Sequence, residues 1–120
     1  MKTWMHTLTA LGSGALLAVM IALNSGLAAR TSTLAASWWA HGVGALVALG
    51  LFRWFGRGGA EGDAPTWAYL GGLPGALVVV LAAVTVNSPL GLTGTLVLGI
   101  LGQTTFGLAC DQFGWLGLPR

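Results

Sequence analysis

The longest uncharged stretch of the chain decides its fold. Residues 64–110 read APTWAYLGGLPGALVVVLAAVTVNSPLGLTGTLVLGILGQTTFGLAC and contain no Asp, Glu, Lys or Arg. A helix needs about 20 apolar residues to cross the hydrocarbon core of a membrane, so this stretch is long enough for two spans. The turn-forming residues 87–91, Asn-Ser-Pro-Leu-Gly, lie between the two spans and predict an antiparallel helical hairpin.

Two earlier stretches, 3–29 and 31–52, also lack these four residue types, and each fits one span. We expect helices at about 7–25, 33–52, 67–86 and 91–111, which gives an all-α membrane protein with four transmembrane helices in a single domain, residues 1–120. Residues 53–66 hold Arg53, Arg57, Glu61 and Asp63 and are typical of an aqueous loop. Lys2 before the apolar residues 8–23 also resembles a secretory signal, but that stretch is long and rich in glycine, so we expect it to remain as the first span.

The composition excludes most other classes of protein. Only 7% of the residues are charged, against roughly 25% in an ordinary soluble domain, and 55% are hydrophobic. The five Lys and Arg residues are scattered and form no basic patch, which argues against nucleic acid as a partner. We expect no enzyme, cofactor or metal site, because no Ser/His/Asp or Cys/His arrangement, phosphate-binding loop, carboxylate pair or metal-ligand spacing is evident.

The distribution of basic residues predicts the orientation of the spans. With the N-terminus in the cytoplasm, Lys2, Arg53, Arg57 and Arg120 fall on the cytoplasmic side and Arg30 falls on the other. The positive-inside rule therefore predicts that both termini and residues 53–66 are cytoplasmic. Tryptophans at the predicted helix ends on that side are consistent with an interfacial belt: Trp4, Trp54, Trp67 and Trp115.

Small residues recur every four positions, which on a helix places them along one stripe. Such stripes allow helix backbones to approach closely in lipid, so we expect most of them to pack within one chain and to leave spare surface for a partner subunit. Pro74 lies inside the expected span 67–86 and is predicted to kink it. The stripes comprise Ala10, Gly14, Ala18, Ala22 and Gly26; Ala36, Ala40, Gly44 and Ala48; Gly71 with Gly75 and Gly72 with Ala76; and Gly91, Thr95, Gly99, Gln103, Gly107 and Asp111.

His41 is the ionisable residue that lies well inside a predicted span. Histidine changes its charge near neutral pH, so His41 is a candidate for proton coupling or gating; the alternative is a neutral imidazole hydrogen-bonded to a neighbouring helix. Trp38 lies on the same helical face and Trp39 about 100° around the axis, so an aromatic and imidazole wall could hold an apolar or cationic solute. The alternative for the tryptophans is packing, or a pair at the membrane interface.

Four further polar residues are candidates for solute binding or for structural roles. Asn24, before Ser25 and Gly26, either ends the first helix in a left-handed turn or faces a solute. Gln103, in the middle of the last span, either bonds another helix or lines a polar path. Asp111 lies where that span emerges, which favours a capping or snorkelling role over ion binding. Ser13 is a further polar candidate in the first span.

Several short motifs follow one another along the chain: Asn24-Ser25-Gly26-Leu27, Gly44, Gly71-Gly72 with Gly75, Pro89-Leu90-Gly91, Gly102-Gln103 and Asp111-Gln112-Phe113-Gly114. Taken together and in this order, they resemble the YdcZ-like four-helix branch of the drug/metabolite transporter superfamily. The resemblance implies a half-size bundle in the bacterial inner membrane, related in architecture to the small multidrug exporters and working as a homodimer or a paired heterodimer, with its subunits either parallel or antiparallel. His41 departs from the family pattern, and the first span lacks the membrane-embedded Glu of the small multidrug exporters.

Three functions are consistent with this sequence. The leading interpretation is a secondary transporter subunit that exports a small organic metabolite or drug by alternating access as a dimer, because four helices packed together leave no room for a solute cavity. The first alternative is a dimeric passive ion channel of the fluoride-channel type, which segment 103–106 superficially resembles. The second is a membrane accessory subunit without transport of its own, with lipid and other subunits as its partners.

Overall fold

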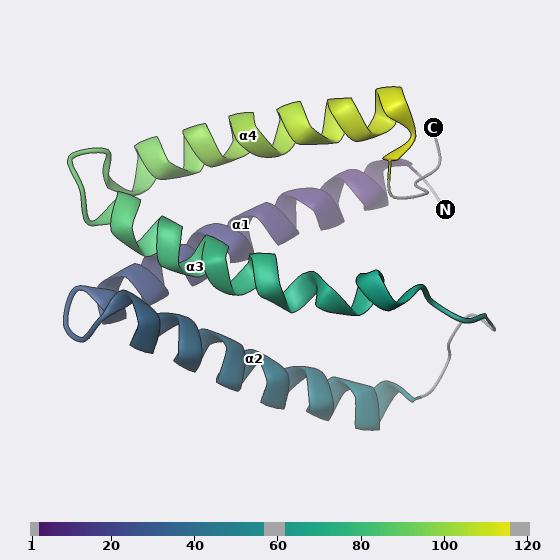
Figure 1. Ribbon diagram of the computed structural model, residues 1–120, viewed down its shortest axis with the longest axis horizontal. Coiled ribbons are helices and arrows are strands. Elements are labelled where there is room, and N and C mark those ends of the chain that lie inside the picture. Colours follow the sequence, from purple (N-terminus) through teal and green to yellow (C-terminus); the bar gives the residue numbers. More distant parts are fainter. Residues whose placement is uncertain (1–2, 57–61, 116–120) are drawn as a thin grey trace.

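The computed structural model describes residues 3–56 and 62–115, and within them the regular structure is entirely helical. The elements are α1 (Thr3–Ala28), α2 (Thr33–Phe55), the short 3₁₀ helix η1 (Thr66–Gly71), α3 (Gly72–Val86) and α4 (Gly91–Phe113) (Figure 1). Four helical segments in the described part of the chain are long and apolar enough to cross a membrane, the third being η1 and α3 together. The predicted all-α fold with four spans is therefore confirmed.

The first helix is longer at both ends than the predicted 7–25. It does not end in a left-handed turn at Gly26 but continues to Ala28, and within it the Ser25 hydroxyl donates to the Ile21 carbonyl (2.7 Å). Asn24 is consequently inside α1, and the capping role expected for it is wrong. The second helix begins at Thr33 as predicted, since the Ser32 hydroxyl accepts a hydrogen bond from the Ala35 amide (3.1 Å) as an N-cap.

The third span is not one helix with a proline kink. The chain changes from 3₁₀ to α geometry at Gly71 and Gly72, so Pro74 lies in the first turn of α3. A first-turn residue has no carbonyl partner for its N–H inside the helix, so proline is tolerated there without bending it. The irregularity predicted at Pro74 is thus a change of helix type two to three residues earlier, with helical backbone dihedrals at both glycines.

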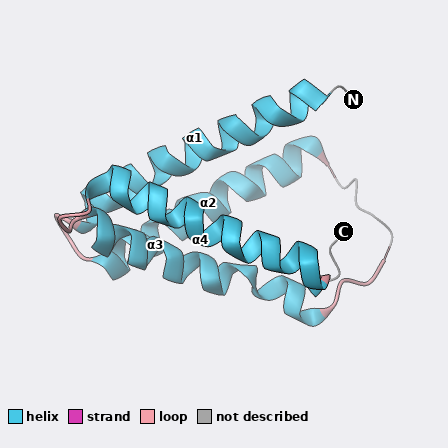
Figure 2. Cartoon of the chain, turned by 90° about the horizontal axis from the view of Figure 1, so that it is seen from above, coloured by secondary structure: helices cyan, strands magenta, loops and turns pink. Residues whose placement is uncertain are grey.

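The four helices converge at one end and spread at the other. The turns α1–α2 and α3–α4 lie together at the narrow end, and the start of α1 and the ends of α2 and α4 lie at the wide end (Figures 1 and 2). The α3–α4 turn is tight, with the Gly91 amide bonded to the Ser88 carbonyl (3.0 Å) and a positive φ of 62° at Gly91, and the predicted antiparallel hairpin is confirmed.

Buried side chains are concentrated toward the narrow end, where Ser25, Ala36 and Ala83 are almost fully covered. Two interhelical hydrogen bonds tie the helices there. The Ser37 hydroxyl donates to the Ala76 carbonyl (3.1 Å), which joins α2 to α3, and the Asn87 amide donates to the Ser25 carbonyl (3.1 Å), which joins the end of α3 to α1. In lipid, the Ser37 hydroxyl and the Asn87 amide would find no hydrogen-bond partner outside the protein, and these two bonds satisfy them.

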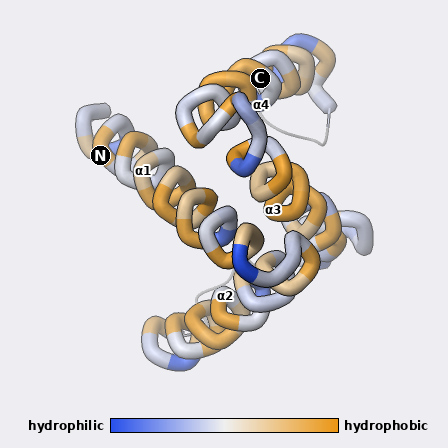
Figure 3. Tube along the Cα trace, turned by 90° about the vertical axis from the view of Figure 1, so that its left-hand side faces the viewer, coloured by the Kyte–Doolittle hydropathy of each residue, from blue (hydrophilic) through white to orange (hydrophobic). Residues whose placement is uncertain are grey.

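Hydrophobic residues recur along all four helices, as the hydropathy colours of Figure 3 show, and many of the large ones are exposed. Large side chains such as Leu16 and Leu34 are more than 70% exposed. A surface of this kind is stable against lipid and not against water. The described tryptophans Trp4, Trp54, Trp67 and Trp115 are all exposed at helix ends of the wide end, where an interfacial belt would place them.

Candidate functional site

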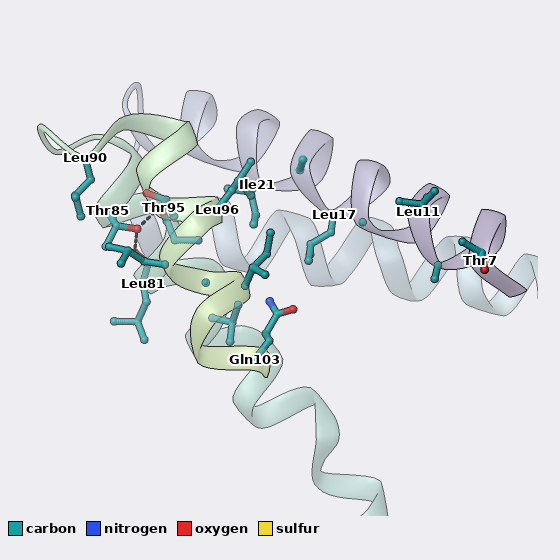
Figure 4. A pocket seen from close by; sticks show the side chains of 18 residues that line it. Thr7, Leu11, Leu17, Ile21, Leu81, Thr85, Leu90, Thr95, Leu96 and Gln103 are labelled. Carbon is teal, nitrogen blue, oxygen red and sulfur yellow. Dashed lines mark hydrogen bonds between the residues drawn. The ribbon is translucent and has the colours of Figure 1, made fainter. Parts of the chain in front are cut away.

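The spreading of the helices opens a groove of about 880 Å³ between α1, α3 and α4. It exists because α4 packs mainly on α3, touches α1 only at a few positions, and makes no contact with α2 among the described residues. Residues one turn apart, most of them small, form two of its walls; Figure 4 labels Thr95 and Gln103 among the lining residues. These are Ala10, Gly14 and Ala18 on α1, and Thr95, Gly99 and Gln103 on α4.

The glycines of this groove do not serve close helix packing within the chain. A Cβ added at Gly14 or at Gly99 would meet no atom within 4 Å, apart from the local helix backbone. The expectation that the α1 and α4 stripes pack inside one chain is therefore wrong at these positions. Their lack of side chains instead provides the volume of the groove.

Most polar side chains that line the groove are already satisfied. The hydroxyl of Thr7 donates to the Thr3 carbonyl (3.1 Å), that of Thr95 donates to the Gly91 carbonyl (2.8 Å), and Thr85 likewise bonds back within α3. Gln103 differs, because its side chain is exposed and forms no hydrogen bond within residues 3–56 and 62–115; Figure 4 shows it among the groove-lining residues. Two amide donors and one carbonyl acceptor therefore remain available in an otherwise apolar groove.

A second, smaller groove of about 510 Å³ lies between α1 and α2. Asn24 and Trp39 line it, together with apolar residues that include Leu16 and Val43. The Asn24 Nδ2 atom is buried and has no hydrogen-bond partner in the described part of the chain. Trp38 packs edge-on against Trp39, with ring centroids 5.2 Å apart, but does not line this groove.

His41 is in neither groove. Its Nδ1 atom lies 2.7 Å from the Ser37 carbonyl oxygen, and because a carbonyl only accepts, Nδ1 is the donor of this hydrogen bond. Nε2 points across the interface to Gly75 of α3. The ring is thus half-buried between α2 and α3, and it does not form one wall with Trp38 and Trp39 around a shared cavity.

The remaining candidate residues are spread over the molecule. Ser13 and Asp111 are exposed and line neither groove, with Asp111 in the last turn of α4. Gly44, Gly71 and Gly107 would meet no atom within 4 Å if a Cβ were added, so they do not hold helices together in this chain. Among the described residues, no group of three or more His, Cys, Asp or Glu side chains could hold a metal ion.

Reasoning from the sequence overlooked most of the walls of the larger groove. Thr7, Thr85 and the α3 side of the groove, including Leu81, were not singled out. The sequence feature that could have indicated the groove is a pair of stripes of small residues, one on the first span and one on the last. A pattern within one helix does not say whether its stripe faces a neighbour or a space.

Four apolar spans with an apolar groove open at one side define a multi-pass integral membrane protein. The family model described as "Putative inner membrane exporter, YdcZ" matches residues 5–120, and the chain therefore belongs to this family. The resemblance stated from the sequence motifs is confirmed, and the family is one of membrane exporters and not a class of enzymes. No curated protein and no solved structure shows significant similarity to the chain.

Proposed function

We propose that the chain is one subunit of a dimeric secondary transporter that exports a small organic solute by alternating access, and that the solute occupies the α1–α3–α4 groove. The observation that supports this most is the size and position of the groove. Its volume of about 880 Å³ lies in the range of about 300–1,000 Å³ typical of small-molecule sites, and it extends along the middle of two spans.

A second subunit is part of the proposal because the groove of one chain is not enclosed. The wall that α2 would supply is missing, since α2 and α4 make no contact in the described residues, and a solute there would be exposed to lipid. Packing of a partner over this side would enclose the solute near the membrane midplane, as alternating access requires. The excess of basic residues on one side favours, for an antiparallel pair, a second chain of opposite bias over an inverted copy. Of these basic residues Lys2, Arg57 and Arg120 lie outside the described part of the chain.

His41 is our candidate for coupling to protons, acting at a distance from the solute. It is the ionisable side chain in the interior of a span in the described residues, and it lies at the α2–α3 interface. A charge on its ring would act on the separation of α2 and α3, because Nε2 faces the Gly75 backbone across a short distance. Loss of gradient dependence in His41→Ala, with solute binding retained, is the expected signature.

The proposal is tested with purified protein in liposomes that carry an imposed pH gradient, against a panel of small organic solutes. We expect saturable, gradient-dependent transport that Gly14→Leu abolishes, because a leucine there fills the groove. Gly12→Leu is the matched control, since Gly12 is in the same helix, lines neither groove and also has nothing within 4 Å. Rapid, unsaturable ion flux would instead show a channel, and the absence of any flux would show an accessory subunit; either result contradicts the proposal.

A further inference from the structure

The charge and hydrogen-bonding inventory of the α1–α3–α4 groove restricts what can bind in it. No Asp, Glu, Lys, Arg or His is among the described residues that line it. An ion moved from water into such a site would lose its hydration without gaining an opposite charge, which is strongly unfavourable in an apolar environment. A neutral solute does not carry this cost.

One side chain provides the polar recognition. Thr7, Thr85 and Thr95 use their hydroxyl protons on carbonyl oxygens of their own helices. The Gln103 amide forms no hydrogen bond within the described residues, and it can both donate and accept. A solute with a hydroxyl or amide group at one end and an apolar body would therefore satisfy Gln103 and fill the remaining apolar volume.

If the partner is a second copy of this chain, it does not change the charge of the site. The charged residues of the described segments are Arg30, Arg53, Asp63 and Asp111, and each lies in a connection or in the last turn of a helix. The middle part of every span that a copy could bring over the groove has no Asp, Glu, Lys or Arg.

We propose that the groove selects uncharged, amphipathic organic molecules through a hydrogen bond to Gln103, and that it discriminates against organic cations and anions. This inference rests on the proposed function, since it names the class of solute for the same groove. It differs from a carboxylate-based site, where a cation would be the preferred solute.

Binding is measured at equilibrium on the full chain in lipid nanodiscs, with no gradient, using three probes that share one apolar body: 4-phenylbutanamide, 4-phenylbutanoate and 4-phenylbutyltrimethylammonium. We expect the neutral amide to bind saturably and the two ions to bind at least about 10-fold more weakly. Gln103→Leu should weaken the amide by roughly 3- to 10-fold, which is the range for one neutral hydrogen bond. Gln112→Leu is the control, because Gln112 is on the same helix and does not line the groove.

Gln103→Glu gives a second and opposite readout. This substitution keeps the shape of the side chain and replaces the amide by a carboxylate. The ammonium probe should therefore bind the Gln103→Glu variant more tightly than it binds the unchanged protein. Equal or tighter binding of either ion to the unchanged protein would overturn the inference. Binding of the amide that never saturates would also overturn the inference. It would indicate that the groove is already occupied, by phospholipid or by a second copy of the chain.

The binding and transport experiments distinguish failure of the inference on solute class from failure of the proposed transporter function. If the amide binds through Gln103 but no solute is transported in liposomes, the inference on solute class stands and the transporter function is wrong. If gradient-driven transport is blocked by Gly14→Leu but favours the ammonium probe and ignores Gln103→Leu, the transporter function stands and the inference is wrong.

Discussion

His41 of α2 lies directly against Gly75 of α3: its Nε2 atom is 3.6 Å from the position that a Cβ at residue 75 would occupy. The ring is held in this orientation by the bond from Nδ1 to the Ser37 carbonyl, and the Ser37 hydroxyl reaches across to the Ala76 carbonyl. One turn of α2 therefore makes the contact with the first turns of α3. Among the candidate glycines 14, 44, 71, 75, 99 and 107, only Gly75 faces another helix at contact distance.

We expect Gly75→Ala to be tolerated and Gly75→Leu to be disruptive. A methyl group at 3.6 Å is in ordinary van der Waals contact, and alanine in a helix is favoured over glycine by about 1 kcal/mol. The leucine side chain would extend into the imidazole and should cost about 1–3 kcal/mol by overpacking. The free energy of unfolding in mixed detergent micelles measures both, and a neutral Gly75→Leu would show that α2 and α3 are not in contact here.

The Asn87 side chain should contribute more to stability than the Ser37 side chain. Asn87 donates to two carbonyls, Ser25 (3.1 Å) and Ala83 (2.8 Å), whereas Ser37 makes one interhelical bond. Interhelical hydrogen bonds in membranes average about 0.6 kcal/mol, so we expect a loss of about 0.5 kcal/mol for Ser37→Ala and about 1–2 kcal/mol for Asn87→Ala. The same unfolding measurement compares them, and the reverse order would contradict the contact between α1 and the end of α3.

Pro74→Ala should change stability by less than about 0.5 kcal/mol, because a first-turn N–H has no helical carbonyl to lose. A proline in the interior of a helix would instead cost about 3 kcal/mol, and its replacement would be strongly stabilising. A large gain in unfolding free energy for Pro74→Ala would therefore favour a continuous, kinked α-helix over the observed change from 3₁₀ to α geometry at Gly71 and Gly72. Leu73→Ala serves as a control for changes in lipid-facing area, since Leu73 is exposed.

The orientation predicted from the basic residues is testable with single cysteines. Cys110 is buried, so it is replaced by alanine and a new cysteine is placed at Thr31 or at Asp63, which lie beyond opposite ends of the bundle. A membrane-impermeant maleimide should label Thr31→Cys in intact bacterial cells and Asp63→Cys only after permeabilisation. The opposite pattern would place both termini outside, and labelling of both positions in intact cells would indicate dual insertion.

The number of spans could be predicted from the sequence because each span depends on a local property, the length of an uncharged stretch. The start of α2 at Thr33 was equally local, since the Ser32 side chain caps the helix by accepting a bond from the amide of Ala35, three residues further along the chain. The end of α1 was not, because Asn24-Ser25-Gly26 is compatible with both a helix end and a helix interior. Packing decided it: Ser25 is buried, and its carbonyl accepts a bond from Asn87 of a distant segment.

The candidate site could be predicted only in part for a similar reason. Gln103 was identified from its polarity within an apolar span, and it does line the larger groove. His41 and Trp39 were grouped by their spacing along one helix, yet α2 has α3 on one side and α1 on another, and the two side chains face different neighbours. The angle at which helices diverge, which creates the groove, depends on contacts between all four spans.

The claim that a solute moves through the α1–α3–α4 groove is tested most directly by the aqueous accessibility of Gly99, a groove-lining position with free space around it. A Cys110→Ala, Gly99→Cys variant is reconstituted in liposomes and exposed to an impermeant maleimide from either face in separate samples. We expect labelling from both faces and protection by 4-phenylbutanamide, because alternating access opens the groove to each side in turn. Labelling only by a lipid-soluble maleimide would show that the groove faces lipid, and it would contradict a transport role.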